Sequence, residues 1–336
     1  MNKGIAVAGN MIVDKLKVIR TFPNRHELTN ILSIDESLGG AACNVGFDLA
    51  RMDKNLPVKI YGAAGADGDG DKVVNAFREY PNIDVSKIRR RGRNAFTDVL
   101  TENDTRARTF LTFGGADATF GMDDVDVSAM EADIFHIGYI LLLPSLDAPD
   151  AEYGTKMAKM LKAIQEKGVL TSVDVVSETG DRYPKLVPPS LRYADFLIVN
   201  EIEAGKTVGM SLRGDDDRLK TGEVMKALRR LKEMGVRRWA VIHTPEGGWG
   251  IDENGNEYGK ESLKLPEGYI QGTVGAGDAF CAGVLYAAYS EKPLSEALFW
   301  GNVSAACSLS KPGGSEGIAP MAEMLKRFEE KTLDQK

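Results

Sequence analysis

The chain has 336 residues, of which 43% are hydrophobic and 27% charged, and its formal net charge is −7. This length allows one large domain or two of ordinary size, and the composition is typical of a soluble globular protein. The net negative charge argues against a nucleic-acid partner, because phosphate backbones are bound by basic surfaces. No apolar run approaches the roughly 20 residues needed to span a bilayer, so we expect no membrane partner.

The amino-terminal residues run directly into an expected first strand that ends near Gly9, without the apolar core of a signal peptide. Three cysteines, Cys43, Cys281 and Cys307, are widely scattered. Their spacing matches neither a zinc site nor a disulfide framework. A reducing compartment suits such cysteines, and we therefore expect a cytoplasmic location.

Two segments in the first third of the chain, at about residues 12–38 and 92–114, alternate polar and apolar side chains. Alternation with a period of two is typical of antiparallel strands with one solvated face. We predict that both segments join in a small antiparallel β lid over an active site. Because exposed strand edges can pair with a second copy, a homodimer joined through the lid strands is a hypothesis.

From about residue 120 onward, short apolar runs alternate with longer amphipathic stretches. Strands are expected over residues 134–137, 169–176, 194–200 and 239–243, and helices over 151–167 and 223–234. Repeated units of this kind predict an α/β fold with a Rossmann-like, doubly wound, mostly parallel sheet covered on both faces. Together with the lid strands, residues 1–330 are expected to form one domain.

The segment Gly272–Phe280 is the most informative, because three glycines precede an expected buried helix. A glycine-rich turn at a helix N-terminus presents N–H groups that can bind an anion. Asp278 could cap this helix, or it could serve as a base beside a bound phosphate. Asp278 stands where a P-loop requires lysine, and Phe280 stands where the dinucleotide fingerprint requires glycine. A glycine anion hole beside a carboxylate suits phosphoryl transfer to a hydroxyl.

Four motifs resemble those of the ribokinase-like (PfkB) sugar kinases and occur in the family's order. Thr273–Asp278 is similar to the C-terminal signature, and Gly39–Asn44 to the N-terminal signature. Asn200–Glu203 resembles the N-x-x-E motif, and Gly62–Gly70 the glycine–aspartate stretch. Each motif alone is weak, but together they span residues 5 to 320. The chain is therefore identified as a member of this carbohydrate kinase family.

This resemblance implies a reaction and a role for each matching residue. ATP and Mg²⁺ would be the cofactors, Asp278 would deprotonate the acceptor hydroxyl, and no dedicated cluster of metal-ligating side chains is predicted. The anion hole would be formed by the amides of Gly275, Ala276 and Gly277. The substrate would be held by Asp14, Gly39, Gly40 and Asn44. The nucleotide and the hydrated magnesium ion would be bound by Asn200, Glu203, Gly248 and Asn302.

Several positions depart from the family's pattern. Gly272 stands where the family has an aspartate that helps bind a monovalent cation, which argues against activation by potassium. Pro245 replaces a glycine of the nucleotide motif, so we expect a differently shaped adenosine pocket. Ile12 and Ala41 replace an asparagine and a lysine of ribose-specific members, which argues against ribose. A basic residue expected after the stretch at Phe110 for an acidic sugar is also missing.

A sugar or sugar derivative is the expected acceptor, and other acceptors stay open. A nucleoside would need an apolar wall for its base, which Phe22, Phe110 or Phe113 could supply. A phosphosugar acceptor and a catalytically silent, sugar-binding regulator are further alternatives. The base and glycine hole argue against the regulator, since a binding protein needs no base there. Arg106 and Arg108 lie on an expected lid strand, where the family often has a basic residue.

Overall fold

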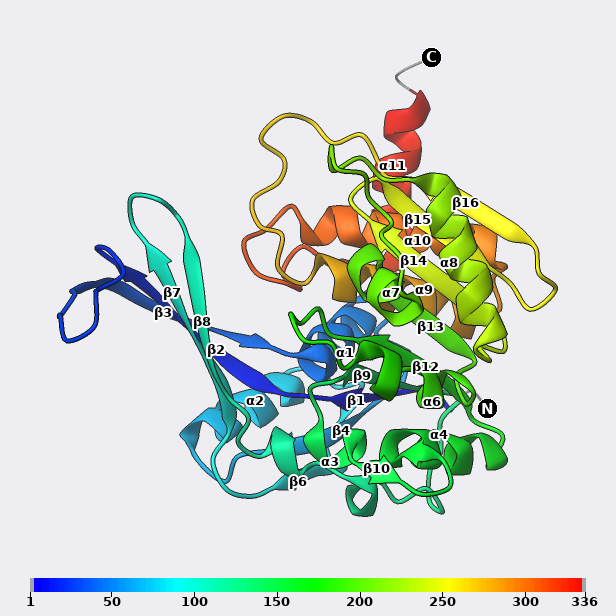
Figure 1. The fold of residues 1–336 in the computed structure, drawn as a ribbon, viewed down its shortest axis with the longest axis horizontal. Helices are drawn as coiled ribbons and strands as arrows, with labels where there is room; N and C mark the ends of the chain where they lie inside the picture. Colours follow the sequence, from blue (N-terminus) through cyan, green and yellow to red (C-terminus); the bar gives the residue numbers. More distant parts are fainter. Residues whose placement is uncertain (1–2, 334–336) are drawn as a thin grey trace.

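The computed structural model describes residues 3–333, with side chains as far as residue 328. A ten-stranded sheet forms its centre, and a four-stranded sheet projects from one side (Figure 1). Within residues 3–333, no helix combines the length and the apolar character needed to cross a bilayer.

The large sheet has the strand order β16-β15-β14-β13-β12-β9-β1-β4-β5, and β6 also pairs with β4. The strands from β14 to β5 pair in parallel, while β15 and β16 add an antiparallel edge. Parallel strands covered on both faces need continuous apolar runs, and β1 is buried at every position. The strands are β1 (Ile5–Gly9), β4 (Val58–Ala64), β5 (Ile83–Asp84), β6 (Ile88–Arg90), β9 (Ile134–Ile140), β12 (Leu170–Val175), β13 (Phe196–Asn200), β14 (Trp239–Thr244), β15 (Gly247–Ile251) and β16 (Glu257–Glu261).

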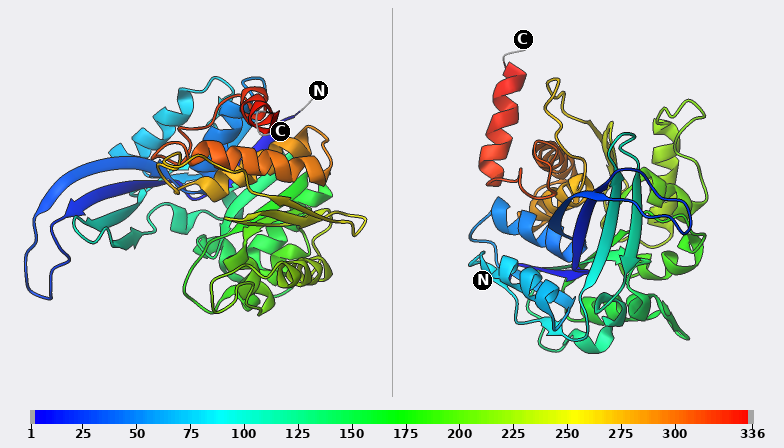
Figure 2. Two further views of the ribbon diagram at one scale, coloured as in Figure 1. Left: turned by 90° about the horizontal axis from the view of Figure 1, so that it is seen from above. Right: turned by 90° about the vertical axis from the view of Figure 1, so that its left-hand side faces the viewer.

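Helices cover both faces of this sheet, each over its own apolar cluster (Figure 2). One face carries α1 (Ala41–Met52), α2 (Gly68–Arg78), α9 (Ala276–Tyr289), α10 (Leu294–Ser308) and α11 (Met321–Leu333). The other carries α3 (Pro144–Asp147), α4 (Lys156–Glu166), α5 (Tyr183–Leu186), α6 (Pro188–Leu191), α7 (Glu201–Val208), α8 (Thr221–Glu233) and the 3-10 turns Asp117–Thr119 and Met122–Asp124. The predicted doubly wound α/β fold is therefore confirmed.

The helix expected over residues 151–167 begins later, at Lys156, so its predicted start is wrong. The preceding residues form a short hairpin of β10 (Pro149–Asp150) and β11 (Gly154–Thr155). The Asp150 carboxylate accepts the backbone N–H groups of Glu152 and Tyr153, which holds the turn. Thr155 then caps α4 by accepting the N–H of Ala158. Local turn hydrogen bonds thus outweigh the helical pattern at these residues.

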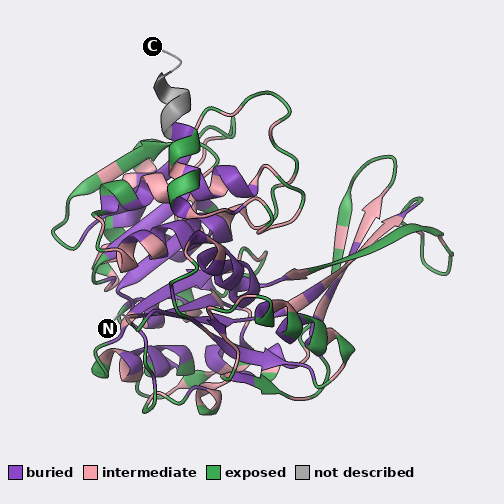
Figure 3. Cartoon of the chain, turned by 180° about the vertical axis from the view of Figure 1, so that it is seen from behind, coloured by how far each residue is buried: buried purple, intermediate pink, exposed green. Residues whose placement is uncertain are grey.

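The projecting sheet contains β2 (Ile12–Ile19), β3 (Ile31–Gly39), β7 (Ala95–Glu102) and β8 (Arg108–Phe113), in the order β3-β2-β7-β8. Its outer pairs are antiparallel as expected, whereas the central pair, β2 with β7, is parallel. The reason is that β2 and β7 both leave the main sheet in one direction, with Ile12 opposite Ala95. Much of this sheet is exposed or half-buried (Figure 3). We refer to it below as the lid sheet.

Asp48 lies in α1, and its carboxyl group is fully buried. Within the described part of the chain, neither of its oxygens has a hydrogen-bond partner. Burial raises its pKa well above the model-compound value of 3.8, while Ser315 and Arg51 act less strongly in the opposite direction. The folded protein therefore holds a proton that the unfolded chain releases. Its contribution to stability is present below about pH 4 and is lost as the pH rises toward the folded-state pKa.

Replacing Asp48 by Asn should consequently stabilise the protein near neutral pH, because the amide keeps the shape without an ionisable group. We expect the Tm at about pH 8 to rise by about 2–4 °C, with a smaller gain near pH 5. Thermal unfolding at both pH values measures this, and the exposed Asp215→Asn serves as the control. A Tm lowered equally at both pH values would contradict the assignment of a neutral Asp48.

Candidate active site

The candidate site lies where the strand order of the large sheet changes direction. After β1 the chain adds β4 on one side, and later β9 on the other. In open α/β sheets, ligands bind at the carboxyl ends of the strands beside such a point. Tyr139 near the end of β9 and Asn200 at the end of β13 lie at this edge. The lid sheet also leaves the main domain here (Figure 1).

Asp278 lies in the first turn of α9, behind the glycine-rich turn. The residue at the N-cap position is Gly275, whose φ of 76° suits a residue without a Cβ. Asp278 does not cap this helix. Its carboxylate instead accepts hydrogen bonds from the Tyr139 hydroxyl at 2.6 Å and from the Asn44 side-chain amide at 2.8 Å. These contacts fix the carboxylate beside the exposed N–H groups of the α9 N-terminus, as a base beside a phosphate site requires.

The surroundings of Asp278 tune its proton affinity. Only 7% of the residue is exposed, and burial raises the pKa of its carboxyl above 3.8. The hydrogen bonds from Tyr139 and Asn44 act against this rise, because they stabilise the carboxylate form. A carboxylate with a raised pKa is a stronger base than one in water, but it becomes ionised only at a correspondingly higher pH.

Removal of the Tyr139 hydroxyl tests this balance. In Tyr139→Phe the carboxylate loses one stabilising donor, so the pKa of Asp278 should rise further. A general base at this position would act in its ionised form, so the acid limb of the kcat/KM profile is expected to move to higher pH by roughly one unit. A pH–rate profile of both proteins measures the shift. An unchanged acid limb, or one moved to lower pH, would show that Tyr139 does not tune the base.

The residues predicted to hold the substrate gather at the foot of the lid sheet. Asp14 on β2 points toward Gly39, because its Oδ2 would lie only 2.6 Å from a Cβ at that glycine. Gly40, with a φ of 92°, leads into α1, which carries Asn44. Burial raises the pKa of Asp14 to about 6. Asp14 approaches the residues that lead into α1, and Asn44 of α1 binds Asp278, so both carboxylates lie beside the start of this helix.

A cavity of about 670 Å³ opens between the last strands and α9–α10. Asn302 lies in its wall and donates hydrogen bonds to the carbonyls of Lys260 and Glu261, which ties α10 to β16. Gly248 does not line this cavity; it lies in β15 against the ring of Phe280. The lining is mostly apolar and consists of Asn200, Glu201, Ile202, His243, Thr244, Pro245, Ser262, Leu263, Leu265, Ile270, Thr273, Ala276, Gly277, Phe280, Asn302, Ala305, Ala306 and Leu309.

A smaller cavity of about 230 Å³ adjoins Asp278 and shares Gly277 and His243 with the larger one. Two further carboxylates, Asp174 and Glu203, line it. Burial raises the pKa of Asp174 well above 3.8 and that of Glu203 to about 7. The negative charge of Asp278 raises both pKa values as well. The lining residues of this cavity include three carboxylates and no lysine or arginine, which favours a cation there.

Asn200 and Glu203 are bound to each other at the start of α7. Glu203 accepts the N–H and the side-chain amide of Asn200, while the Asn200 side chain accepts the N–H of Glu203. This capping box orients Glu203 toward the smaller cavity. The described residues contain no group of three candidate metal ligands. Mg²⁺ keeps several waters and needs only one or two carboxylates besides substrate phosphates, so Glu203 and Asp174 fit a hydrated magnesium ion.

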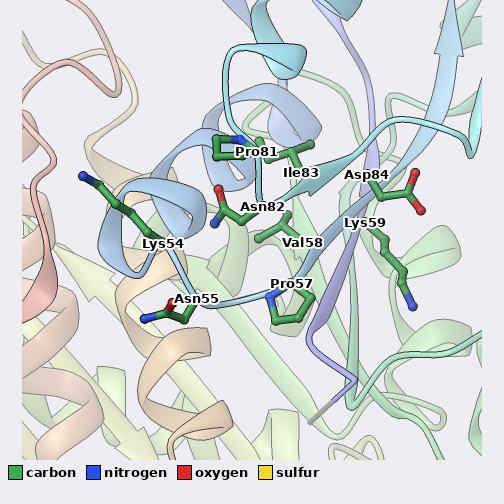
Figure 4. A pocket seen from close by; sticks show the side chains of 9 residues that line it. All are labelled: Lys54, Asn55, Pro57, Val58, Lys59, Pro81, Asn82, Ile83 and Asp84. Carbon is green, nitrogen blue, oxygen red and sulfur yellow. The ribbon is translucent and has the colours of Figure 1, made fainter. Parts of the chain in front are cut away.

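A third concavity, of about 410 Å³, shares no lining residue with the two cavities described above (Figure 4). Its walls come from the segments that precede and begin β4 and β5, at the amino ends of the strands. Ligands of open α/β sheets bind at the opposite, carboxyl ends. The side chains that line it are those of Lys54, Asn55, Pro57, Val58, Lys59, Pro81, Asn82, Ile83 and Asp84. This concavity is therefore not the catalytic site.

Sequence reasoning missed three residues of the site. Asp174 lies near the end of β12 and could have been found, since polar residues at the carboxyl ends of parallel strands gather at the binding edge. Tyr139 carries no sequence pattern that links it to Asp278. His243 ends up between both cavities, and burial lowers its pKa to about 4, which keeps the ring neutral.

The sequence profile described as "pfkB family carbohydrate kinase" matches residues 3–321. The chain belongs to the pfkB family of carbohydrate kinases. The family predicted from the four motifs is thus confirmed.

Relatives of known sequence and structure agree with this membership. An uncharacterized sugar kinase of Archaeoglobus fulgidus is 27% identical over 80% of this chain and 97% of its own length. An ATP-dependent ribose-1-phosphate kinase of Halopiger xanaduensis is 25% identical over 97% of this chain and 98% of its own. The ribokinase of Arabidopsis thaliana, solved with ribose and ATP, is 18% identical and superposes with a TM-score of 0.81 over 98% of this chain and 99% of that one. This last likeness shows that the two share a fold.

Proposed function

We propose that this pfkB-family chain is an ATP-dependent kinase that phosphorylates a hydroxyl group of a sugar or sugar derivative. The position of Asp278 carries the proposal. Its carboxylate lies in the first turn of α9, held by Tyr139 and by Asn44 of α1, and it directly follows Ala276 and Gly277, which line the apolar cavity. A base between a donor site and an acceptor site is what phosphoryl transfer to an alcohol requires.

In this proposal, Asp278 accepts the proton of the acceptor hydroxyl as the oxygen attacks the γ-phosphorus of ATP, and the bond from that phosphorus to the β,γ-bridging oxygen breaks to release ADP. The N–H groups of Gly275, Ala276 and Gly277 stabilise the negative charge on the transferred group. Glu203 and Asp174 would hold Mg²⁺ through water, with Asn200 orienting Glu203. The ion, when bound, neutralises charge on the ATP phosphates. No requirement for potassium is proposed, because Gly272 has no side chain that could supply a carboxylate ligand.

The larger cavity suits the nucleoside part of ATP. Its lining is mostly apolar, as binding of a planar base requires, and Ala276 and Gly277 connect it to the α9 N-terminus. Asn302 keeps the wall of this cavity in place. Gly248 contributes indirectly, by leaving room for the Phe280 ring that forms part of the lining. We place the enzyme in the cytoplasm, where ATP and reduced cysteines are both found.

A nucleoside is the second candidate acceptor. Phe110 lies on the same face of the lid sheet as Asp14, since it pairs with Val99 two positions along from Thr97. It is 61% exposed and could cover a base. Phe113 instead pairs with Phe96 on the opposite face, and Phe22 lies in the loop after β2. The structure therefore favours Phe110 among the three aromatic residues considered for this role.

We also propose a homodimer joined through the lid sheet. Its edge strands, β3 and β8, expose a series of large apolar side chains that a partner copy would cover. Gel filtration with light scattering should give about twice the mass of the chain, and a purely monomeric protein would contradict the proposal. The exposed residues are Ile31, Leu32, Ile34, Phe110, Leu111 and Phe113.

A coupled assay of ADP release with Mg-ATP tests the proposed function. The acceptors are pentoses, hexoses, polyols, sugar acids, sugar phosphates and nucleosides. We expect ADP release that depends on one class of acceptor and stays low without it. ATP binding without turnover on any acceptor would contradict the kinase and favour a regulatory protein.

A further inference from the structure

A row of four polar side chains crosses all strands of the lid sheet on one face. Asp14 pairs with Ser37 on β3 and with Thr97 on β7, and Thr97 pairs with Thr112 on β8. Directly paired residues project from the same face of a sheet. The hydroxyl oxygens of Thr97 and Thr112 lie 2.8 Å apart, in agreement with this. We call these four residues the Asp14 row.

The Asp14 row lies at the foot of the lid sheet, beside the catalytic corner. Its central member, Asp14, approaches Gly39 at the end of β3. The chain continues from there into α1, whose Asn44 binds the Asp278 carboxylate. Neighbouring strands are about 4.8 Å apart, so the row presents hydroxyl and carboxylate groups at intervals that suit a polyhydroxylated molecule.

No cationic side chain accompanies this row. Arg108 is the first basic residue on the same face, and it lies four residues from Thr112, roughly 14 Å along β8. Lys15 and Lys17 project from the opposite face and form ion pairs with Asp69 and Asp98. Most members of the next row outward are apolar. That row consists of Asp35, Leu16, Val99 and Phe110.

Two backbone donors on the lid side of this corner are also occupied. At the N-terminus of α1, the N–H of Ala41 donates to the Asn10 side chain and that of Ala42 donates to the Asn10 carbonyl. The carboxyl groups at this corner are those of Asp14, Asp278 and the buried Asp117, which accepts the N–H of Met11. A carboxylate or phosphate on the acceptor would therefore meet like charges without a counter-charge.

We infer that the acceptor is a neutral polyhydroxylated molecule bound through the Asp14 row, and that sugar acids and sugar phosphates are rejected by charge. The inference deepens the proposed function, on which it rests for the identity of the acceptor site. It separates this chain from its relative named as a ribose-1-phosphate kinase. Ser37, Thr97 and Thr112 become specificity-determining residues, because their uncharged hydroxyls stand where an anionic acceptor would need a cation.

Calorimetric titration without nucleotide tests the inference separately from catalysis. The ligands are a matched set on each carbon skeleton: the neutral sugar, the corresponding sugar acid and the sugar phosphate, with a nucleoside added. We expect a neutral member to bind, and its charged analogues to bind on the order of 100-fold more weakly. An anionic analogue that binds equally well, or no binding by any neutral member, would overturn the inference. Neutral binding without turnover would support it while contradicting the kinase.

Two arginine variants on one strand provide the matched comparison. Thr112→Arg adds a cation to the Asp14 row. It should lower the ratio of the affinity for the neutral ligand to the affinity for its anionic analogue by about tenfold or more. Thr109→Arg adds the same charge on the opposite face of β8, where Thr109 pairs with Leu100, and should leave the preference unchanged. Circular dichroism confirms that both variants fold. Equal effects of the two variants would show that the row does not select by charge.

Discussion

Replacement of Asp278 by Asn should lower kcat by about 10²–10⁴, the usual contribution of a general base. The amide cannot take the proton of the acceptor hydroxyl, yet it fills the same space and can still accept the hydrogen bond of Tyr139. The loss corresponds to about 3–5 kcal/mol in the activation free energy. Steady-state kinetics with saturating Mg-ATP measure it, on whichever acceptor the wild type uses.

Two controls separate loss of the base from loss of structure. The Tm of Asp278→Asn should stay within a few degrees of the wild type, and its affinity for ATP should be nearly unchanged. The exposed Asp181→Asn should behave as wild type in every assay. Turnover near the wild-type rate in Asp278→Asn would refute the proposed mechanism.

A second large effect is expected from Gly277→Val. Gly277 lines both cavities, and an added Cβ would lie 3.1 Å from the His243 ring. The branched side chain should therefore crowd the anion hole, and kcat/KM should fall by about 10²–10³, as when one oxyanion donor is lost. The backbone conformation of a residue within α9 suits valine, so the fold should survive. Activity and Tm measured together test this separation.

Gly275→Ala is the matched comparison in the same turn. Its φ of 76° is unfavourable for alanine, and the new Cβ would lie 2.6 Å from the Gly314 Cα. We expect this variant to lose stability, with a Tm lowered by several degrees, whereas Gly277→Val loses activity at nearly constant Tm. If Gly275→Ala instead lost activity at constant Tm and Gly277→Val lost stability, Gly275 would be the functional glycine of the turn and Gly277 the structural one.

Much of the fold could be predicted from periodicity alone. The strands expected at residues 134–137 and 239–243 occur at Ile134–Ile140 and Trp239–Thr244, because buried parallel strands need continuous apolar runs. The parallel pairing of β2 with β7 could not be predicted, since it depends on where two distant segments leave the main sheet. The late start of α4 depends on hydrogen bonds within a hairpin that the helical pattern hides.

The candidate site could be predicted only where residues lie within motifs. Asp278 and its glycine turn follow from helix-terminus chemistry, and Asn44 from the resemblance. That Asn44 binds Asp278 could not be foreseen, because the two are 234 positions apart in the sequence. Tyr139 reaches the same carboxylate from a third element. Contacts of this kind arise from tertiary packing, which local sequence patterns do not predict.

Transfer of a labelled γ-phosphate from ATP to the acceptor tests the central claim most directly. Wild type and Asp278→Asn would be compared side by side, with the label followed in the acceptor product and in inorganic phosphate. The account predicts label on the acceptor hydroxyl with the wild type, and a loss of about 10²–10⁴ in that rate with the variant. Label that appears only as inorganic phosphate, or that reaches the acceptor equally fast in both proteins, would contradict it.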